Sequence, residues 1–346
     1  MKVVHLVPAM EQGGVESVVL SLNRAVVGAG GESVVVSRGG RLAETIERDG
    51  GRHVALDLKS KNPLTYFSRA RRLRKTLAEL APDLVCVHSR VPAWLFVRAN
   101  RALGVRWISY AHGANSVSRY SAVMTKGDLV VTPSRFLADF LLAHYGAKDA
   151  TLKERLRVIP PCVDTARFDP NGLDEAFVAE MRRAWGIGPD DFVTMAVGRI
   201  TPLKGLDALI REVAAKPAGK LVIVGEADRR HRDYAESLKK LAAELGAANR
   251  IVFAGAQQKV PECLSIASEV VSANTTKPET FGLSIAEALA MNRPVRLFRR
   301  FGGAAEILDA VAASGAESSR AAVISLYNFD IMSARTLETY ARLTRH

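Results

Sequence analysis

The chain of 346 residues is long enough for two domains, and its 48% of hydrophobic residues is ordinary for a well-packed α/β protein. No apolar run approaches the roughly 20 residues of a membrane-spanning helix, and the apolar start has no signal-peptide cleavage site, so we expect a cytoplasmic protein. A formal net charge of +12 favours nucleic acid, anionic membranes or phosphorylated small molecules as partners, without choosing among them.

Strand-like and helix-like runs alternate along the first half, which predicts a parallel sheet covered by helices. A buried strand is expected over 3–7, followed by Gly13-Gly14 and by a helix with an apolar face from Val15 to Val26. Ser134 is expected to cap a helix that runs to His144. The further predicted strands are 33–37, 83–88, 105–110, 128–132 and 157–161.

Residues 62–81 are predicted to form an amphipathic helix with basic side chains crowded beside its apolar face. The residues expected to point inward are Leu64, Phe67, Leu73, Leu77 and Leu80, and the cations are Arg69, Arg71, Arg72, Arg74 and Lys75. Stems of such side chains can lie on apolar surface while their charges reach lipid phosphates. We therefore expect peripheral binding to an anionic membrane surface, the inner face of the cytoplasmic membrane, with an ordinary solvated helix face as the alternative.

The segment 160–170 carries three prolines and little periodicity, so a domain boundary is placed there. The predicted domains are 1–165 and 166–330, with a final helix over 331–346 whose return to the first domain is left open. Strands of the second domain are predicted over 192–197, 220–224, 250–254, 269–272 and 294–298, with a further one over 322–326. Two doubly wound domains of this kind place ligand sites at the carboxyl ends of their strands, facing a shared cleft.

Two cations follow the predicted strand 192–197. Gly198-Arg199 comes directly after it, and Lys204-Gly205 precedes the next helix. Cations at a strand's carboxyl end, beside glycines and the start of a helix, suit a pyrophosphate. The alternative is that both side chains merely solvate a loop.

Two carboxylates and a glycine follow the predicted strand 269–272. Gly282 allows backbone N–H groups to approach a ligand closely, and the helix that starts there favours a phosphate at its amino end. Glu279 can accept hydrogen bonds from sugar hydroxyls, and Glu287, two turns along, can reach ribose hydroxyls. Taken singly, Glu279 could serve as a charge partner for the helix and Glu287 as a solvated residue.

Together these features resemble the retaining GT-B glycosyltransferases of the large family four, over nearly the whole chain. The matching pieces are Gly13-Gly14, His112-Gly113, the segments 131–134 and 158–168, Gly198-Arg199 with Lys204-Gly205, and Pro278-Glu279 through 287–290. The resemblance implies the GT-B fold, two Rossmann-like domains, and a nucleotide-sugar donor as substrate with no separate cofactor.

The resemblance also implies roles for individual residues. Arg199 and Lys204 would hold the donor pyrophosphate and neutralise the departing nucleotide, and Glu279 and His112 would contact the donor sugar. Glu287 would bind the ribose, and Gly13-Gly14 would close over the donor. The residues expected to lie along the sugar and phosphates are Thr280, Phe281, Gly282 and Leu283.

The family usually works without a metal ion and with retention of configuration. In the mechanism favoured for such enzymes a donor phosphate oxygen takes the acceptor's proton, so no protein nucleophile is expected. The residues themselves offer no metal site, because Cys86, Cys162 and Cys263 lie far apart and lack metal-ligand spacing.

We expect transfer of a hexose or N-acetylhexosamine from a UDP-sugar to a lipid-linked cell-surface glycan such as lipopolysaccharide core. Residues 115–121 are similar to bacterial surface-polysaccharide members. One alternative is a soluble small-molecule acceptor. Another is a nucleic-acid-binding protein, which the dispersed basic residues and the 6% of aromatic residues disfavour.

Some weaker signals keep two interpretations. Gly302-Gly303 with Glu306 are either a turn or part of a loop near the donor. Arg296, Arg299 and Arg300 either serve an anionic partner or are simply exposed. The histidines expected to be structural are His5, His53, His88 and His144.

Overall fold

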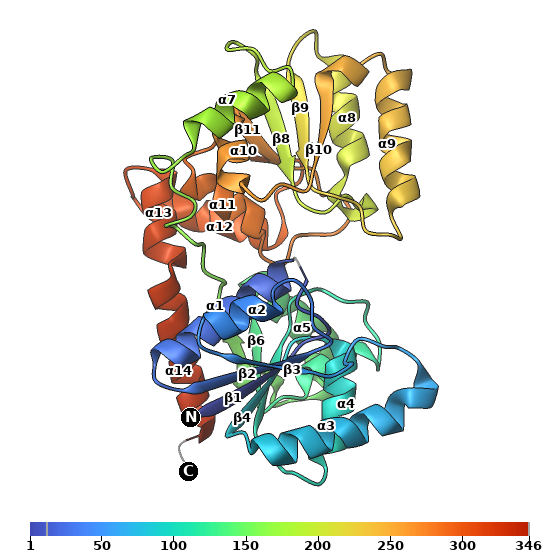
Figure 1. Cartoon of the computed structure of the whole chain (residues 1–346), viewed down its shortest axis with the longest axis vertical. Helices are drawn as coiled ribbons and strands as arrows, with labels where there is room; N and C mark the ends of the chain where they lie inside the picture. Colours follow the sequence, from blue (N-terminus) through green and yellow to red (C-terminus); the bar gives the residue numbers. More distant parts are fainter. Residues whose placement is uncertain (12, 345–346) are drawn as a thin grey trace. The chain divides into compact units, whose positions relative to one another are not determined.

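The computed structural model describes residues 1–11 and 13–344, which divide into two compact α/β units (Figure 1). The first unit consists of Met1–Cys162 together with the last helix, which begins at Phe329. The second unit is Val163–Asn328. Across the described part of the chain, no helix is both long and apolar enough to cross a bilayer.

The first unit is built on a seven-stranded sheet of order β3-β2-β1-β4-β5-β6-β7. Its strands are β1 (Lys2–Leu6), β2 (Glu32–Ser37), β3 (Arg52–Ala55), β4 (Leu84–Val87), β5 (Trp107–Tyr110), β6 (Leu129–Thr132) and β7 (Leu156–Val158). All neighbouring pairs are parallel; on β1, His5 lies opposite Val35 on one side and Cys86 on the other. The carboxyl ends of β1, β4 and β5 therefore lie next to one another at one edge of the sheet.

Helices cover both faces of this sheet because its buried strands alternate side chains between two apolar cores. The helices are α1 (Gly14–Gly28), α2 (Ala43–Arg48), α3 (Tyr66–Leu80), α4 (Arg90–Asn100), α5 (Arg135–Tyr145), α6 (Leu152–Arg155) and α14 (Phe329–Thr344). Val3 packs in the core that contains residues of α1 and α14, whereas Val4 packs against α3 and α4. In the first of these cores the Tyr340 hydroxyl lies 2.9 Å from that of Tyr110, which fixes the last helix to this unit.

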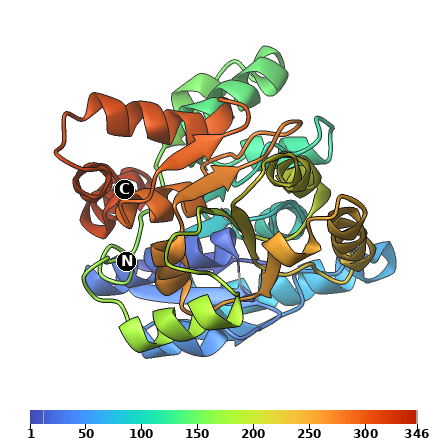
Figure 2. The ribbon, with the colours of Figure 1, turned by 90° about the horizontal axis from the view of Figure 1, so that it is seen from above.

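The second unit has a five-stranded parallel sheet of order β10-β9-β8-β11-β12. Its strands are β8 (Val193–Val197), β9 (Lys220–Val224), β10 (Ile251–Gly255), β11 (Glu269–Ser272) and β12 (Val295–Leu297). Its helices are α7 (Glu175–Ala184), α8 (Leu206–Ala215), α9 (Arg232–Glu244), α10 (Val260–Ile266), α11 (Leu283–Ala290), α12 (Gly302–Ala313) and α13 (Ser319–Tyr327). α8 and α9 lie side by side over one face, seen nearly end on in Figure 2, and the other helices pack in the core of the opposite face.

The predicted α/β class with two parallel sheets is confirmed, but the strand predicted over 322–326 is wrong. These residues lie inside α13, whose first turn is capped by the Ser318 hydroxyl, which accepts from the Ala321 N–H at 3.1 Å. Val323 and Tyr327, four residues apart, share one buried face of this helix. A five-residue apolar run is compatible with a strand and with a buried helix, so its pattern alone could not decide.

The inward face predicted for residues 62–81 is wrong at its start. Leu64 is 90% exposed and Phe67 is 65% exposed, because α3 begins only at Tyr66, after a one-turn 3₁₀ helix over Pro63–Thr65. The buried face that passes through Leu73 runs back through Arg69 at helical spacing.

Arg69 is accordingly buried and does not join the exposed cations, contrary to the prediction. Its guanidinium donates to the Thr65 hydroxyl at 3.1 Å and to the Asn62 carbonyl at 3.2 Å. The side chain therefore ties the preceding turn to the helix.

Candidate active site

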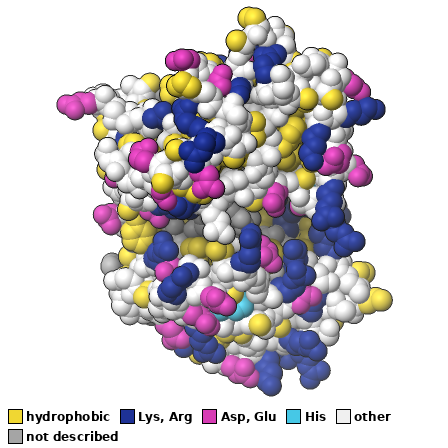
Figure 3. Space-filling model, turned by 45° about the horizontal axis from the view of Figure 1, so that its top comes forward, with side chains coloured by type: hydrophobic (Ala, Val, Ile, Leu, Met, Phe, Trp, Pro, Cys, Tyr) yellow, Lys and Arg dark blue, Asp and Glu magenta, His cyan; other side chains and the backbone are white. Residues whose placement is uncertain are grey.

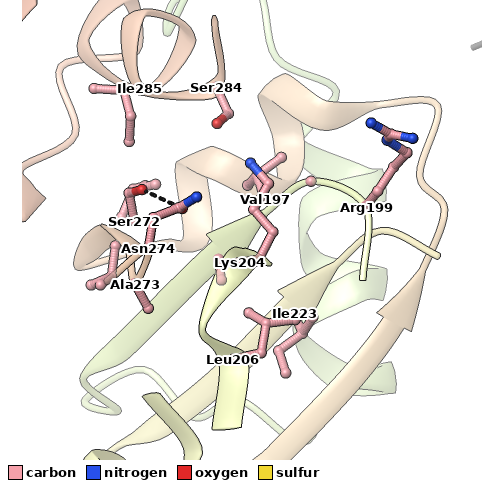
Figure 4. A pocket seen from close by; sticks show the side chains of 14 residues that line it. Val197, Arg199, Lys204, Leu206, Ile223, Ser272, Ala273, Asn274, Ser284 and Ile285 are labelled. Atoms are coloured by element: carbon pink, nitrogen blue, oxygen red, sulfur yellow. Dashed lines mark hydrogen bonds between the residues drawn. The ribbon is translucent and has the colours of Figure 1, made fainter. Parts of the chain in front are cut away.

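A pocket lies at the carboxyl edge of the second sheet, between the loops that follow β8 and β11 (Figure 4). These strands are parallel neighbours, with Thr194 opposite Glu269, so their carboxyl ends emerge side by side. The polar residues that line the pocket are Arg199, Lys204, Ser272, Asn274 and Ser284. The structure thus brings the predicted pyrophosphate cations to the beginning of α11.

Lys204 is held at the pocket by the turn that follows it. Gly205 has φ +60°, and a Cβ at this position would lie 2.0 Å from the Ala273 carbonyl oxygen, so the two loops can approach this closely only at a glycine. In Figure 4 the Lys204 ammonium points toward α11, which carries Ser284, whereas Arg199 points away from it.

Lys204 forms an ion pair with Glu279, a contact that the sequence did not predict. The ammonium Nζ donates to Oε1 of Glu279, and the two side chains are 27% and 23% exposed. Arg199, in contrast, is exposed and makes no ion pair within residues 1–11 and 13–344. Lys204 is therefore charge-compensated before any ligand binds, whereas Arg199 is available to an anion.

The loop that carries Glu279 rests on the start of α12. The Gly303 N–H donates to the Glu279 carbonyl at 2.8 Å, and a Cβ on Gly303 would lie 2.2 Å from the Thr280 carbonyl oxygen. Of the two interpretations of Gly302-Gly303, this contact favours a part in shaping the loop over an isolated turn.

The end of this loop presents backbone rather than side chains. Phe281 is buried and meets the ring of Tyr327 edge-on at 5.5 Å, so only its main chain can face a ligand. Gly282, at φ +100°, is the cap residue of α11, which begins at Leu283. N–H groups at the start of a helix favour a negatively charged ligand.

Glu287 lies on α11 and is not the solvated residue of the alternative interpretation. Burial raises the pKa of its carboxyl to about 7, and the charge of Arg167 opposes this rise. A carboxyl group with such a pKa is half-ionised near neutrality and gains from any ligand that donates hydrogen bonds to its ionised form.

A pH-dependent affinity follows from this carboxyl. Ribose hydroxyls donate to carboxylate, so we expect UDP to bind about tenfold more weakly at pH 6 than at pH 8, and Glu287→Gln to abolish most of that difference. Calorimetric titration of both proteins measures the affinity for UDP at each pH. The Gln variant serves as the reference for the pH dependence that comes from ionisation of UDP itself. Equal pH profiles for the two proteins would contradict the ribose role.

The same pKa has a consequence for folding. The pKa in the folded protein is raised above the ordinary value of 4.5, so the carboxyl stabilises the fold at low pH, and this stability is lost as pH rises from about 4.5 to about 7. Glu287→Gln should remove that part of the pH dependence of unfolding.

The remaining predicted residues belong to the first unit. Gly13 is the cap residue of α1 in extended conformation, and a Cβ on Gly14 would meet no atom within 4 Å. His112 follows β5 and is half-buried, with Nε2 3.0 Å from Nδ1 of His88. These residues lie at the carboxyl edge of their own sheet, and their contacts with the donor stay predictions.

Several polar residues at the two edges escaped the sequence analysis. The Ser272 hydroxyl donates to Oδ1 of Asn274 at 3.0 Å, and the Asn274 amide donates to the Lys277 carbonyl at 3.3 Å. Their position directly after a buried strand was the signal available. His88 was predicted to be structural. Its contact with His112 depends on β4 lying beside β5, an order that was not predicted from the sequence.

Arg296 is not available to an anionic partner. Its guanidinium lies between two carboxylates, 2.9 Å from Glu212 and 3.0 Å from Glu269. Arg300 pairs with Asp309, and Arg299 donates to the Thr275 carbonyl at 3.3 Å. Neither interpretation holds for Arg296, which belongs to an internal ion-pair network.

Comparison with known protein families covers most of the chain. Residues 12–167 match Glycosyltransferase Family 4, and residues 177–316 match Glycosyl transferases group 1. The two halves of the chain are therefore similar to these two families of glycosyltransferase domains. The loops after β8 and β11 lie within the part that matches the group 1 family, and His112 lies within the part that matches family 4.

Curated relatives match part of the chain. A D-inositol 3-phosphate glycosyltransferase of Acidothermus cellulolyticus is 33% identical over 52% of this chain and 40% of its own length. One of the same name from Thermomonospora curvata is 30% identical over 58% of this chain and 53% of its own. The chain therefore spans about half the length of the curated relatives it matches.

Solved structures match over nearly the full length. A glycosyltransferase from Rickettsia africae has a TM-score of 0.84 at 21% identity, covering 100% of this chain and 99% of that one. Anabaena HepE in complex with UDP-glucose has a TM-score of 0.82 at 18% identity, covering 99% and 100%. WaaG, a glycosyltransferase involved in lipopolysaccharide biosynthesis, has a TM-score of 0.67 at 17% identity, covering 99% and 98%. The predicted GT-B fold is confirmed.

Proposed function

We propose that the protein is a retaining glycosyltransferase that moves a hexose or N-acetylhexosamine from a UDP-sugar to an acceptor. The observation that carries this proposal is the pocket between β8 and β11, which is lined by Arg199, Lys204 and the first residues of α11. The GT-B neighbour HepE in complex with UDP-glucose supports the choice of donor. Sites of this kind lie at the carboxyl ends of parallel strands.

The pocket suits a reaction in which a nucleoside diphosphate departs. Departure places negative charge on phosphate oxygens, and charged donors fixed in advance stabilise such charge most effectively. Arg199 and Lys204 supply the cations, while N–H groups at the beginning of α11 supply the helix dipole. Glu279 forms an ion pair with Lys204 and can therefore orient it. Its carboxylate can also accept hydrogen bonds from sugar hydroxyls.

Activity is expected to survive removal of metal ions. In the proposed mechanism Arg199 and Lys204 provide the positive charge that a divalent ion would otherwise provide at the diphosphate. We expect EDTA-treated protein to keep turnover within about twofold, since no charge-stabilising group is lost. Transfer abolished by EDTA and restored by manganese would contradict this mechanism.

For the acceptor we propose a lipid-linked cell-surface glycan, reached from a membrane surface. The start of α3 carries two exposed apolar side chains, Leu64 and Phe67, and the Arg98 guanidinium lies 5.7 Å from the Phe67 ring centre. The same segment of the chain carries exposed cations, called here the basic patch: Lys59, Lys61, Arg71, Arg72, Arg74 and Lys75. Figure 3 shows dark blue side chains grouped at the lower right of the molecule, on the unit that carries α3. An apolar tip beside cations is the composition of an interfacial membrane anchor.

Vesicle binding tests this surface. The protein should sediment with anionic vesicles at low salt and stay in solution with neutral ones. Because each cation contributes about 1 kcal/mol near an anionic leaflet, Arg71→Glu with Arg74→Glu should weaken partitioning by a factor on the order of 100.

The matched control reverses the charges of Lys239 and Lys240, two exposed cations on α9 of the second unit, by substitution with Glu. This control should change vesicle partitioning little. Equal recovery in the supernatant with anionic and neutral vesicles would favour a soluble acceptor.

The second candidate is a soluble, phosphorylated small-molecule acceptor. The curated relatives named D-inositol 3-phosphate glycosyltransferase favour it, and they match about half of their own length. A free phosphate group on the acceptor would also suit a protein of net charge +12.

One transfer assay separates the two candidates. Radiolabelled UDP-glucose and UDP-N-acetylglucosamine are incubated with a truncated lipopolysaccharide core or with D-inositol 3-phosphate. Label in the lipid-extractable fraction supports the first acceptor, and label in a water-soluble product supports the second. Proton NMR of the product should show the donor's anomeric configuration; an inverted product would overturn the retaining mechanism.

A further inference from the structure

Three histidines form a hydrogen-bonded chain across adjacent strands of the first unit. His5 lies on β1, His88 directly follows β4, and His112 follows β5. Nδ1 of His5 is 3.1 Å from Nε2 of His88, and Nδ1 of His88 is 3.0 Å from Nε2 of His112. The His88 and His112 rings are stacked, with centres 5.3 Å apart and planes 18° apart. The chain thus runs from the interior of the first sheet to its carboxyl edge.

All three rings are neutral near pH 7. Burial lowers the pKa of His5 to about 3 and that of His112 to about 4. Burial, together with the two neighbouring histidines, lowers the pKa of His88 further below its ordinary value. A neutral imidazole has one N–H donor and one acceptor nitrogen, so the two hydrogen bonds of the chain allow only two arrangements of protons.

The buried end of the chain favours one arrangement. Nε2 of His5 is buried and has no hydrogen-bond partner among the residues that the structure describes. His5 shares its face of β1 with Val3, which packs in an apolar cluster with Leu22 and Val26.

If each N–H of the chain pointed from His112 toward His5, Nε2 of His5 would carry a proton and would be a donor without an acceptor. Orphaned buried N–H groups are rare and costly. The opposite arrangement puts N–H on Nδ1 of His5 and of His88, which makes Nε2 of His112 an acceptor.

We propose that His5 and His88 are positioning residues that hold His112 in its Nδ1–H tautomer, so that His112 donates a hydrogen bond to the sugar donor. Both nitrogens of His112 are then engaged, since Nε2 accepts from His88 and Nδ1 carries the proton. His112 therefore cannot remove the acceptor's proton, which agrees with a reaction that uses no protein base. The role toward the donor rests on the proposed function, whereas the tautomer does not.

Nitrogen-15 NMR of protein labelled at histidine reads the tautomer directly. In the wild-type protein at pH 7, the His112 signal, assigned by its loss in His112→Asn, should show a protonated Nδ1 and an unprotonated Nε2. In His88→Leu the donor to Nε2 is gone, so this pattern should weaken or invert. In His88→Asn the amide nitrogen occupies nearly the place of Nδ1, so the pattern should persist.

Kinetics on the same variants test the consequence. His88→Leu should lower kcat about tenfold with the donor KM changed less than about threefold, and His88→Asn should recover most of kcat. His144→Asn is the matched control, because His144 is exposed and its one hydrogen bond to a described residue is to the Phe140 carbonyl of its own helix. Unfolding midpoints of all variants establish that each one is folded.

Two results would overturn the inference: a protonated Nε2 on His112 in the wild-type protein, or an unchanged tautomer in His88→Leu. A third result separates it from the proposed function. If the tautomers are as expected but His112→Ala turns over normally, the histidine chain stands and the donor contact assigned to His112 is wrong.

Discussion

Arg199→Ala is expected to lower kcat/KM for the sugar donor by about 10- to 150-fold while leaving the fold intact. The Arg199 side chain is exposed and forms no ion pair with the residues that the structure describes, so its removal leaves no buried charge without a partner. A charge-assisted contact to phosphate is worth about 1.5–3 kcal/mol, and each 1.4 kcal/mol corresponds to a factor of ten. Steady-state kinetics with a fixed acceptor measure the loss.

The matched control for Arg199 is Arg211→Ala, which removes an exposed arginine from α8 in the same unit. It should change kcat/KM less than about twofold, since it lies outside the pocket. The companion variant Lys204→Ala should match or exceed the effect of Arg199→Ala, because it also strips Glu279 of its ion-pair partner. Normal turnover in both pocket variants would remove the pyrophosphate assignment.

Glu279→Ala is expected to reduce kcat about 100-fold and to change the Kd of UDP less than about threefold. The proposed contact is to the sugar where bonds change, and an interaction made mainly in the transition state appears in kcat rather than in nucleotide affinity. Glu287→Ala should show the opposite pattern, since the ribose is a spectator in the reaction. Rapid-quench turnover and calorimetric titration with UDP separate the two effects.

The ion pair between Lys204 and Glu279 makes these variants interdependent. A double-mutant cycle with Lys204→Ala and Glu279→Ala should show a coupling well above the 0.3–0.5 kcal/mol of independent sites. The pair of Lys259 and Asp174, 2.7 Å apart and exposed, serves as the control for a pair outside the pocket. If Glu279→Ala weakened UDP binding as much as turnover, its place beside the sugar would be wrong.

The fold, and the grouping of residues at the pocket between β8 and β11, were predictable because both depend on sequence order. Apolar runs of strand length alternate with helical faces, and Arg199 and Lys204 directly follow one predicted strand. Glu279 and Gly282 follow a second strand. Parallel strands bring such loops to one edge, so their neighbourhood follows from topology alone.

The errors arose where a local pattern has two solutions. The helix predicted over 62–81 begins only at Tyr66, and Phe67 lies one residue past its buried face. A shift of one residue turns a helical face by 100°. Residues 322–326 are too few to separate a strand from a helix. The first error concerns which face of a helix is buried, and the second concerns a run too short to assign. Neither changes the predicted α/β fold class.

The remaining features depend on contacts that a linear pattern does not contain. The histidine chain requires β4 to lie between β1 and β5, so that His88 can bridge His5 and His112. The raised pKa of Glu287 requires knowing which side of α11 is covered. The Lys204–Glu279 pair requires the Gly205 turn to pack on Ala273.

Calorimetric titration of the folded protein with UDP-glucose tests the central claim most directly, because it asks whether the pocket between β8 and β11 holds a nucleotide-sugar. We expect saturable one-to-one binding that is lost in the Arg199→Ala, Lys204→Ala double variant and kept in Arg211→Ala. Absence of binding heat and of thermal stabilisation with UDP-, GDP- and ADP-sugars alike, in protein that unfolds cooperatively, would contradict it.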